Sequence, residues 1–292
     1  MVTVKSIIKN NIKNCLSFDI EGFIESNKQS FYIDKKYVSK SEEQYEIEKN
    51  TEFILAFLDE AGVKATFFFL GRICRDIPHV IKETARYGHE IACHSHEHLR
   101  IFGLTKDKFR ENVAYAKKIL EDVSGYKVAG FRAPDFSITK SNLWALDVLK
   151  ETGFIYDSSI CPTGIHDVYG IGDAEPFIHT LNNGLIEFPA STVKILGKRL
   201  PYAGGGYFRL YPLILTKYLI QKSNKNGQPC MFYLHPYEMG PVIPCIYELG
   251  YYRRFRHYYN CNKSSNRLKE IIQVFNFSTC IEILQDRGLI NS

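Results

Sequence analysis

Short apolar runs alternate with amphipathic runs over the first 160 residues of the chain. The apolar runs are bounded by turn residues and have the length of buried strands. Strands are predicted at 14–20 (NCLSFDI), 63–71, 89–95, 127–134 and in the FIYDSSI segment that follows Gly153. Apolar positions at helical spacing predict helices at 45–62, 77–88, 105–125 and 139–153.

Local signals agree with these boundaries. Gly62 and Gly88 follow the ends of two helices, Pro78 lies near a helix start, and Thr105 is a suitable N-cap. Repeated strand–helix units predict an α/β fold with a parallel sheet. Because the chain holds many such units, a barrel is favoured over an open doubly wound sheet. SFDIEG offers Asp and Glu where a phosphate-binding loop would offer glycine, which argues against a nucleotide-binding fold.

The pattern loosens after residue 160. LIEFPAS and AGGGYFRLYP predict short strands with a glycine turn at 204–206, and YPLILTKYLIQKSNKNG predicts a helix. PCMFYLHPYE (229–238) is a strong buried strand, and the tail supplies one or two closing helices. Neither repeats nor a linker interrupt the chain. We therefore expect one domain over 1–292, with a core at about 12–240 and a C-terminal extension at 241–292 packed on the barrel.

Composition narrows the class of protein. The 292 residues are 45% hydrophobic, which is ample for a large core, and the net charge of +5 gives no argument for nucleic-acid binding. The eight cysteines include no Cys-x-x-Cys pair, so free buried thiols in a reducing compartment are expected. No export signal and no membrane-spanning run of ~18 apolar residues is recognised. The expectation is a soluble, cytoplasmic protein.

Polar side chains follow several predicted strands at the same end. They are Asp19 and Glu21, then His94, His96 and His98, and finally Arg132, Asp157 and His235. Reactive groups of barrels and doubly wound sheets gather at the carboxyl ends of the strands. We therefore expect these side chains to form one site.

The histidines predict a metal centre. If residues 94–98 begin a helical turn, His94 and His98 share one face and both imidazoles can reach one cation, while His96 points elsewhere. His96 is then a surface or supporting group. The stretch is not a His-Glu-x-x-His motif, since Arg100 occupies the position of the second histidine.

The first strand supplies carboxylates. Asp19 and Glu21 are two residues apart and face the same way in an extended segment, so one can bind the cation and the other can act as a base. His235 is the candidate general acid, or else an ordinary strand-end histidine. Arg132 is the candidate partner of the base, or else an anchor for phosphate or substrate, or a structural ion pair. Asp157 either orients His235 or caps a turn.

Five motifs in order resemble the polysaccharide deacetylases of the chitooligosaccharide deacetylase homology group. The motifs are SFDIEG (17–22), HSHEH (94–98), RAPDF (132–136), YDSSI (156–160) and LHP (234–236). HDVYGIGDAEPF, AGGGYFRLYP, FYLHPYE and RRFRHYYN also resemble the branch found in exosortase-linked exopolysaccharide loci.

This resemblance implies a deformed (β/α)7-type barrel, a divalent metal, usually Zn²⁺, and hydrolysis of N-acetyl groups on an amino sugar of a glycan. It implies Asp19 as the base, Arg132 as its partner, His235 as the acid, and His94 and His98 as metal ligands. The common pattern has the metal-binding aspartate directly after the base, where this chain has Ile20. Glu21 is therefore the expected third ligand, although its role and that of Asp19 could be exchanged.

Two rival functions fit the same residues: a metal-dependent amidase for small amides and a non-catalytic glycan-binding protein. A cytoplasmic deacetylase is expected to act on a sugar nucleotide, a lipid-linked intermediate or a nascent chain, in peripheral association with the inner membrane face. Tyr207, after the glycine run, is the expected sugar-stacking side chain of the cleft, whereas most other aromatics are expected in the core.

Overall fold

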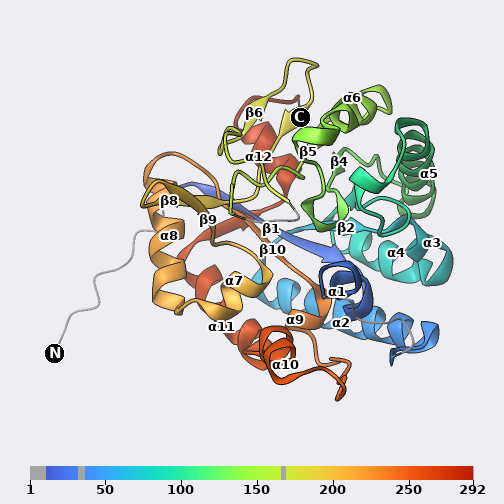
Figure 1. The fold of residues 1–292 in the computed structure, drawn as a ribbon, viewed down its shortest axis with the longest axis vertical. Coiled ribbons are helices and arrows are strands. Elements are labelled where there is room, and N and C mark those ends of the chain that lie inside the picture. Colours follow the sequence, from blue (N-terminus) through green and yellow to red (C-terminus); the bar gives the residue numbers. More distant parts are fainter. Residues whose placement is uncertain (1–10, 32–36, 166–168, 292) are drawn as a thin grey trace.

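One large, mostly parallel sheet organises the computed structural model, which describes residues 11–31, 37–165 and 169–291 (Figure 1). Its strands are β1 (Lys13–Ile20), β2 (Thr66–Phe69), β3 (Glu90–Cys93), β4 (Gly130–Phe131), β5 (Tyr156–Asp157), β6 (His179–Thr180), β7 (Ile186–Glu187), β10 (Met231–Leu234) and β11 (Asn276–Ser278). A separate antiparallel hairpin is formed by β8 (Thr192–Ile195) and β9 (Lys198–Pro201).

The strand order is β10-β1-β2-β3-β4-β5-β7-β6, with β11 paired to β1. All neighbours are parallel except β6 and β7. Among the described residues the ladder stays open between β10 and β6, so the sheet is a curled half-barrel rather than a closed ring. The predicted α/β class and barrel-type architecture are confirmed.

Helices surround the sheet (Figure 1). They are α1 (Phe23–Phe31), α2 (Lys40–Ala61), α3 (Gly71–Asp76), α4 (Pro78–Arg86), α5 (Lys106–Ser124), α6 (Trp144–Glu151), α7 (Gly205–Leu210), α8 (Leu213–Lys225), α9 (Pro236–Met239), α10 (Tyr251–Tyr258), α11 (Ser264–Val274) and α12 (Cys280–Asp286). The predicted caps are present: the Thr105 side chain accepts from the Lys108 amide, and Gly62 ends α2 in the left-handed conformation.

The two faces of the sheet have separate cores. Alternate strand residues such as Leu16 and Phe67 pack outward against the surrounding helices. Their neighbours Cys15 and Phe68 face inward and belong to a second cluster of buried residues that includes Leu284 of α12. Since Cys15 lies near the start of β1, α12 fills the amino-terminal end of the curled interior. The carboxyl ends of the strands are left for polar side chains.

The short strand predicted in LIEFPAS is present as β7, but the strand predicted in AGGGYFRLYP is wrong, because α7 begins at Gly205. Gly204 is extended and forms a parallel bridge with Tyr233 of β10. A Cβ at Gly204 would lie 1.9 Å from the Tyr233 ring, so only glycine allows this close approach. The glycines therefore bring the chain against β10 before the helix starts.

The predicted C-terminal extension contributes a strand. β11 pairs with β1 through Lys13, Asn14 and Cys15, so residues predicted to pack on the barrel belong in part to its sheet. A single domain over 1–292 remains a prediction.

Residues 1–10, on which the expectation of no export signal depends, lie outside the described residues. Across the residues that the structure describes, no helix has the length and apolarity needed to cross a membrane. All eight cysteines are free thiols, and only Cys245 is exposed.

Candidate functional site

The end of β1 presents two buried carboxylates on the inner side of the sheet. Asp19 is 3% exposed and Glu21 is 2% exposed, while Ile20 between them is in the outer core. Extended backbone gives this alternation, as predicted. The two carboxylates have different partners: Glu21 faces histidines, whereas Asp19 pairs with an arginine.

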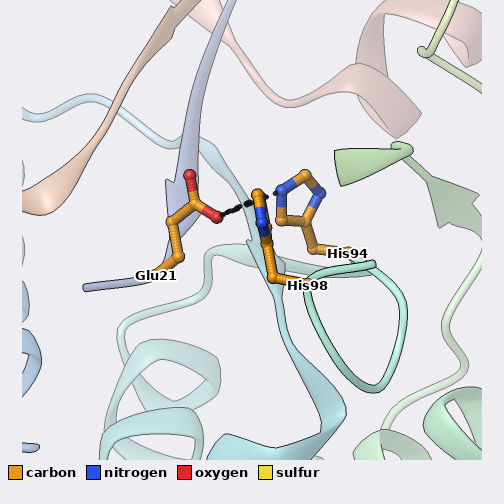
Figure 2. Close-up of side chains that lie close together, drawn as sticks. All are labelled: Glu21, His94 and His98. Atoms are coloured by element: carbon orange, nitrogen blue, oxygen red, sulfur yellow. Dashed lines mark ion pairs between the residues drawn. The ribbon is translucent and has the colours of Figure 1, made fainter. Parts of the chain in front are cut away.

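Glu21 faces the two predicted histidines (Figure 2). Its Oε2 lies 2.6 Å from Nε2 of His98 and 3.7 Å from Nε2 of His94. Within the described residues, Glu21, His94 and His98 are the one group of three or more potential ligands whose donor atoms all lie within 4.8 Å of one another. All three side chains are buried.

A left-handed turn, not a helix, brings the imidazoles together. Residues 94–98 are not helical, and Ser95 has φ 73°. The turn is fixed by neighbours: the Gly71 amide donates to the Ser95 carbonyl at 2.9 Å, and the His96 amide donates to Oδ1 of Asn112 at 2.8 Å. The helical premise is therefore wrong, although the two rings still meet, with centroids 5.5 Å apart.

His94 is oriented for binding through Nε2. Its Nδ1 lies 2.8 Å from the Arg132 carbonyl, which can only accept, so Nδ1 carries the hydrogen and the Nε2 lone pair faces Glu21. A backbone carbonyl behind an imidazole is the usual support of a metal-binding histidine. Two imidazole nitrogens and one carboxylate oxygen, buried and convergent, fit a divalent metal of the zinc type.

Electrostatics keep the Glu21 carboxylate ionised. Burial opposes its charge, but His98, His235 and His94 together lower the pKa of Glu21 well below its usual value. Burial likewise opposes a proton on His98, yet Glu21 raises the pKa of His98 to about 9. A proton and a divalent cation therefore compete for the same imidazole lone pair.

Asp19 pairs with Arg132 instead. Nη1 of Arg132 donates to Oδ1 of Asp19 at 2.6 Å and to Oγ of Ser17 at 2.9 Å, and Nη2 donates to Oγ of Ser158 at 3.1 Å. The guanidinium is fully buried over the Phe68 ring, 4.0 Å from its centroid. This set of contacts fixes Asp19 in one orientation.

His235 reaches the same cluster from the end of β10. Its Nε2 is 3.3 Å from Oε1 of Glu21, and its Nδ1 is 2.9 Å from Oε2 of Glu238. Glu238 also accepts from the His235 amide and from Nε of Arg209 at 2.7 Å. Burial raises the pKa of Glu238, but Arg209 and His235 outweigh it and lower that pKa to about 2. An ionised carboxylate therefore holds Nδ1, and Nε2 faces the site.

Glu238, not Asp157, is thus the carboxylate behind His235. Asp157 accepts hydrogen bonds from the amide and Oγ of Ser159, two residues on, which is the turn-capping alternative left open by the sequence. Burial raises its pKa, and burial together with Asp157 raises the pKa of the neighbouring Glu187. The sequence reasoning missed Glu238, although the spacing His-Pro-x-Glu with proline at the first helical position signals a capping box.

His96 lies outside the cluster, as predicted. Its ring meets that of Tyr115 edge-on, with centroids 4.8 Å apart. Arg100, which excludes a second-histidine motif, donates to Oδ2 of Asp135 at 2.7 Å.

A cavity of about 310 Å³ opens beside His235. Tyr207 lines it, as expected for the cleft, whereas Phe208 is fully buried and Trp144 packs at the core. A larger cavity of about 600 Å³ lies at the opposite end of β1, around Lys13, and includes none of the predicted site residues.

The fold and this site together define a class: a half-barrel α/β protein with a candidate His-His-Glu metal centre, an Asp–Arg pair and a carboxylate-supported histidine at the strand ends. Comparison with known proteins agrees with the resemblance. Residues 33–156 match the polysaccharide deacetylase family, and residues 158–285 match a domain of unknown function (DUF3473). The polysaccharide deacetylase match thus includes His94, His98 and Arg132, whereas His235 lies in the region matched by DUF3473. The exosortase-linked branch remains a prediction.

Individual relatives cover different shares of the chain. A peptidoglycan-N-acetylglucosamine deacetylase of Bacillus cereus is 33% identical over 98 residues, which are 33% of this chain and 36% of that protein. The match therefore spans about a third of the curated relative's length.

Among solved structures, one assigned to the polysaccharide deacetylases of Mycobacterium smegmatis has a TM-score of 0.64 at 20% identity, covering 94% of this chain and 91% of its own. The Puue allantoinase structure has a TM-score of 0.60 at 12% identity, with coverage of 95% and 91%. At these identities both show the shared fold.

Proposed function

We propose that this protein is a metal-dependent hydrolase that removes N-acetyl groups from an amino sugar in a polysaccharide or its biosynthetic precursor. The observation that carries the proposal is the convergence of Glu21, His94 and His98 at the strand end where Asp19 and His235 also lie. The match of residues 33–156 to the polysaccharide deacetylase family supports this reaction class, as does the similarity to the Bacillus cereus peptidoglycan-N-acetylglucosamine deacetylase.

The residues present fit a divalent metal, and Glu21, His94 and His98 would hold it. Zn²⁺ is the proposed ion, because two histidines and one glutamate leave a coordination position open in catalytic zinc sites. When bound, such an ion acidifies water and polarises a carbonyl group.

Two other side chains at the site are the proposed base and the proposed acid of the reaction. Asp19 is the proposed base: it lies two residues from Glu21, and Arg132 fixes its orientation. His235 is the proposed acid that gives a proton from Nε2 to the leaving amine, since Glu238 holds Nδ1. Separate partners for Asp19 and Glu21 support these roles over the exchanged assignment. The products are acetate and a free amino sugar.

The proposed substrate is an exopolysaccharide or its precursor on the cytoplasmic side of the membrane. Resemblance to the exosortase-linked branch supports the glycan class. Eight free cysteines, seven of them buried, support a reducing compartment. A sugar nucleotide, a lipid-linked intermediate and a nascent chain are the substrates to compare.

Elemental analysis of the purified protein, combined with an acetate-release screen, tests the proposal. We expect about one metal ion per chain and acetate release from N-acetylated oligosaccharides. His98→Ala should lose both metal and turnover, whereas His96→Ala is the matched control and should keep both. Full activity in His98→Ala would refute the scheme.

The same screen separates the rivals. Because an allantoinase has a similar fold, small linear and cyclic amides, allantoin included, form the second substrate arm. Turnover of these amides alone would favour the amidase. Sugar binding without metal or turnover would favour a non-catalytic glycan-binding protein.

A further inference from the structure

The helix α10 has an unusual surface. Its sequence YYRRFRHY places three aromatic side chains in solvent, with Tyr251 87%, Tyr252 72% and Phe255 45% exposed. Arg253, Arg254 and Arg256 on the same eight-residue helix are also exposed. Exposed aromatic groups among cations mark a binding surface more often than a solvated face.

Buried side chains, chiefly Arg209, hold α10 in place. Nη1 of Arg209 donates to the carbonyls of Arg256, His257 and Tyr259, at 3.3, 3.0 and 3.0 Å. These bonds pair backbone carbonyl groups at the C-terminus of α10 that have no partner within the helix. The buried Phe23 ring lies 5.9 Å from that of His257 and 5.7 Å from that of Tyr258. The exposed side chains therefore project from a fixed support.

The same arginine connects α10 to the candidate active site. Nε of Arg209 donates to Glu238, and Glu238 holds His235. The short helix α9, which follows β10 (Figure 1), lines the same cavity as α10. Tyr252, Phe255 and Arg256 line the 310 Å³ cavity together with His235. One wall of the space next to the proposed general acid is thus made of aromatic rings and a cation.

The charge of this wall is positive. Glu238 is the carboxylate that lines the cavity among the described residues, and Arg209 and His235 already pair with it. Arg253 and Arg254 lie outside the cavity lining, on the exposed surface of α10, where they form no ion pair with a carboxylate of the described residues. Arg254 lies 5.7 Å from the centroid of the Tyr247 ring. Guanidinium groups bind carboxylate and phosphate oxygens in preference to neutral hydroxyls.

We propose that α10 and the adjoining cavity form a subsite for an anionic sugar unit next to the N-acetylated one. Tyr252 and Phe255 stack on sugar rings, and the arginines bind the anionic group, a carboxylate or a phosphate. This subsite rests on the proposed deacetylase function and names the class of glycan that the enzyme takes. A cavity of about 310 Å³ is at the small end of ligand pockets, as suits one sugar unit.

Three soluble probes test the subsite by calorimetric binding and by acetate release. They are a tetrasaccharide of alternating glucuronate and N-acetylglucosamine, the neutral N-acetylglucosamine tetramer, and UDP-N-acetylglucosamine. We expect an anionic probe to bind about tenfold more tightly than the neutral one at low salt, the effect of one charge-assisted hydrogen bond. Preference for the uronate or for the diphosphate identifies which anion the subsite takes.

The variant Arg253→Gln/Arg254→Gln/Arg256→Gln should abolish this preference and leave binding of the neutral tetramer within about twofold. Lys118→Gln, on an exposed cation of α5, is the matched control and should retain the preference. Tyr252→Ala should weaken all three probes, and circular dichroism verifies that each variant is folded.

Two outcomes overturn the subsite: equal binding of neutral and anionic probes, or an unchanged preference in the triple variant. Binding to phosphatidylcholine–phosphatidylglycerol vesicles without any preference among the soluble probes would also overturn it, in favour of a membrane surface. The two proposals fail separately. If the protein prefers anionic probes through its arginines but releases no acetate, the deacetylase function is refuted and the subsite stands. If it releases acetate equally from neutral and acidic oligosaccharides, the subsite is refuted and the deacetylase function stands.

Discussion

At the residue scale, Arg132 connects more of the site than any other side chain described above. Its guanidinium contacts Asp19, Ser17 and Ser158, and its carbonyl accepts from the His94 ring. The same residue therefore positions the proposed base through its side chain and a proposed metal ligand through its backbone. Substitution of the side chain can separate these two effects.

Arg132→Met should reduce acetate release by at least about tenfold while leaving metal content near that of the wild type, because the backbone carbonyl behind His94 is retained. It should also lower the free energy of unfolding by about 3–5 kcal/mol, since Asp19 is left buried without its ion pair. Acetate release, elemental analysis and urea unfolding measure the three effects.

Arg132→Lys is the companion variant, since it keeps the charge and loses the forked geometry. It should be more stable than Arg132→Met. Unchanged turnover in Arg132→Met would show that Asp19 does not need this pair.

His89 governs a pH dependence remote from the metal centre. Burial, and then Lys64, lowers the pKa of His89 from 6.5 to about 4. The ring is 6% exposed, and its Nδ1 accepts from the Ala65 amide at 3.3 Å. The unfolded chain therefore binds a proton at this position between pH 6.5 and pH 4 that the folded chain does not.

Stability should consequently be full above pH 6.5 and fall as the pH drops toward 4, by about 3 kcal/mol from this group alone. In His89→Asn, which retains an acceptor for the Ala65 amide, the fall should be smaller by that amount. Urea unfolding at several pH values measures the difference. Parallel curves for the two proteins would contradict the assignment.

At the scale of the element, the turn at 94–98 decides whether the imidazoles meet. Ser95 adopts φ 73°, a conformation that costs an ordinary residue of order 1–3 kcal/mol and glycine almost nothing. Interactions with α3 and α5 hold it: the Ser95 carbonyl accepts from Gly71, and its hydroxyl donates to Asn112.

Ser95→Gly should therefore leave stability within about 1 kcal/mol, while Ser95→Val should cost about 1–3 kcal/mol, because a β-branched residue is strained at positive φ. Metal affinity, measured by competition with a chelator, should fall in Ser95→Val and stay near the wild-type value in Ser95→Gly. Wild-type affinity in Ser95→Val would mean that the turn does not determine the positions of His94 and His98.

The sequence predicted those features that depend on regular patterns. Continuous apolar runs located the main strands, and strand-end position selected Asp19, Glu21, Arg132 and His235, which the structure brings to one region. Features that depend on contacts with residues distant in the sequence could not be predicted. A serine carries no signal for a left-handed turn, and the glycines at 204–206 suggest a turn until the contact with Tyr233 is known.

At the scale of the whole molecule, the two matched families share one sheet. Their boundary falls at residues 156 and 158, at β5. Strands β7, β10 and β11 come from the second region and pair with β5 and β1. Neither region completes the sheet alone: the proposed acid His235 lies in the second region, whereas β1 and the proposed base Asp19 precede both matched regions.

Unfolding should therefore be cooperative across the boundary. Trp144, the single tryptophan, reports the first region by fluorescence, and far-ultraviolet circular dichroism reports both. We expect the two urea midpoints to coincide. Two separated transitions would mean that the regions fold as independent domains.

The central position of β1 also bears on how the protein is made. β1 leaves the ribosome well before its neighbours β10 and β11, which are the last two strands of the described sheet in chain order. Until they emerge, β2 can cover one edge of the strand that carries Asp19, but the edge that receives β10 stays open. An uncovered apolar strand edge can pair with other nascent chains. The order of synthesis thus delays completion of the candidate site until β10 has emerged, and leaves an apolar strand edge exposed in the meantime.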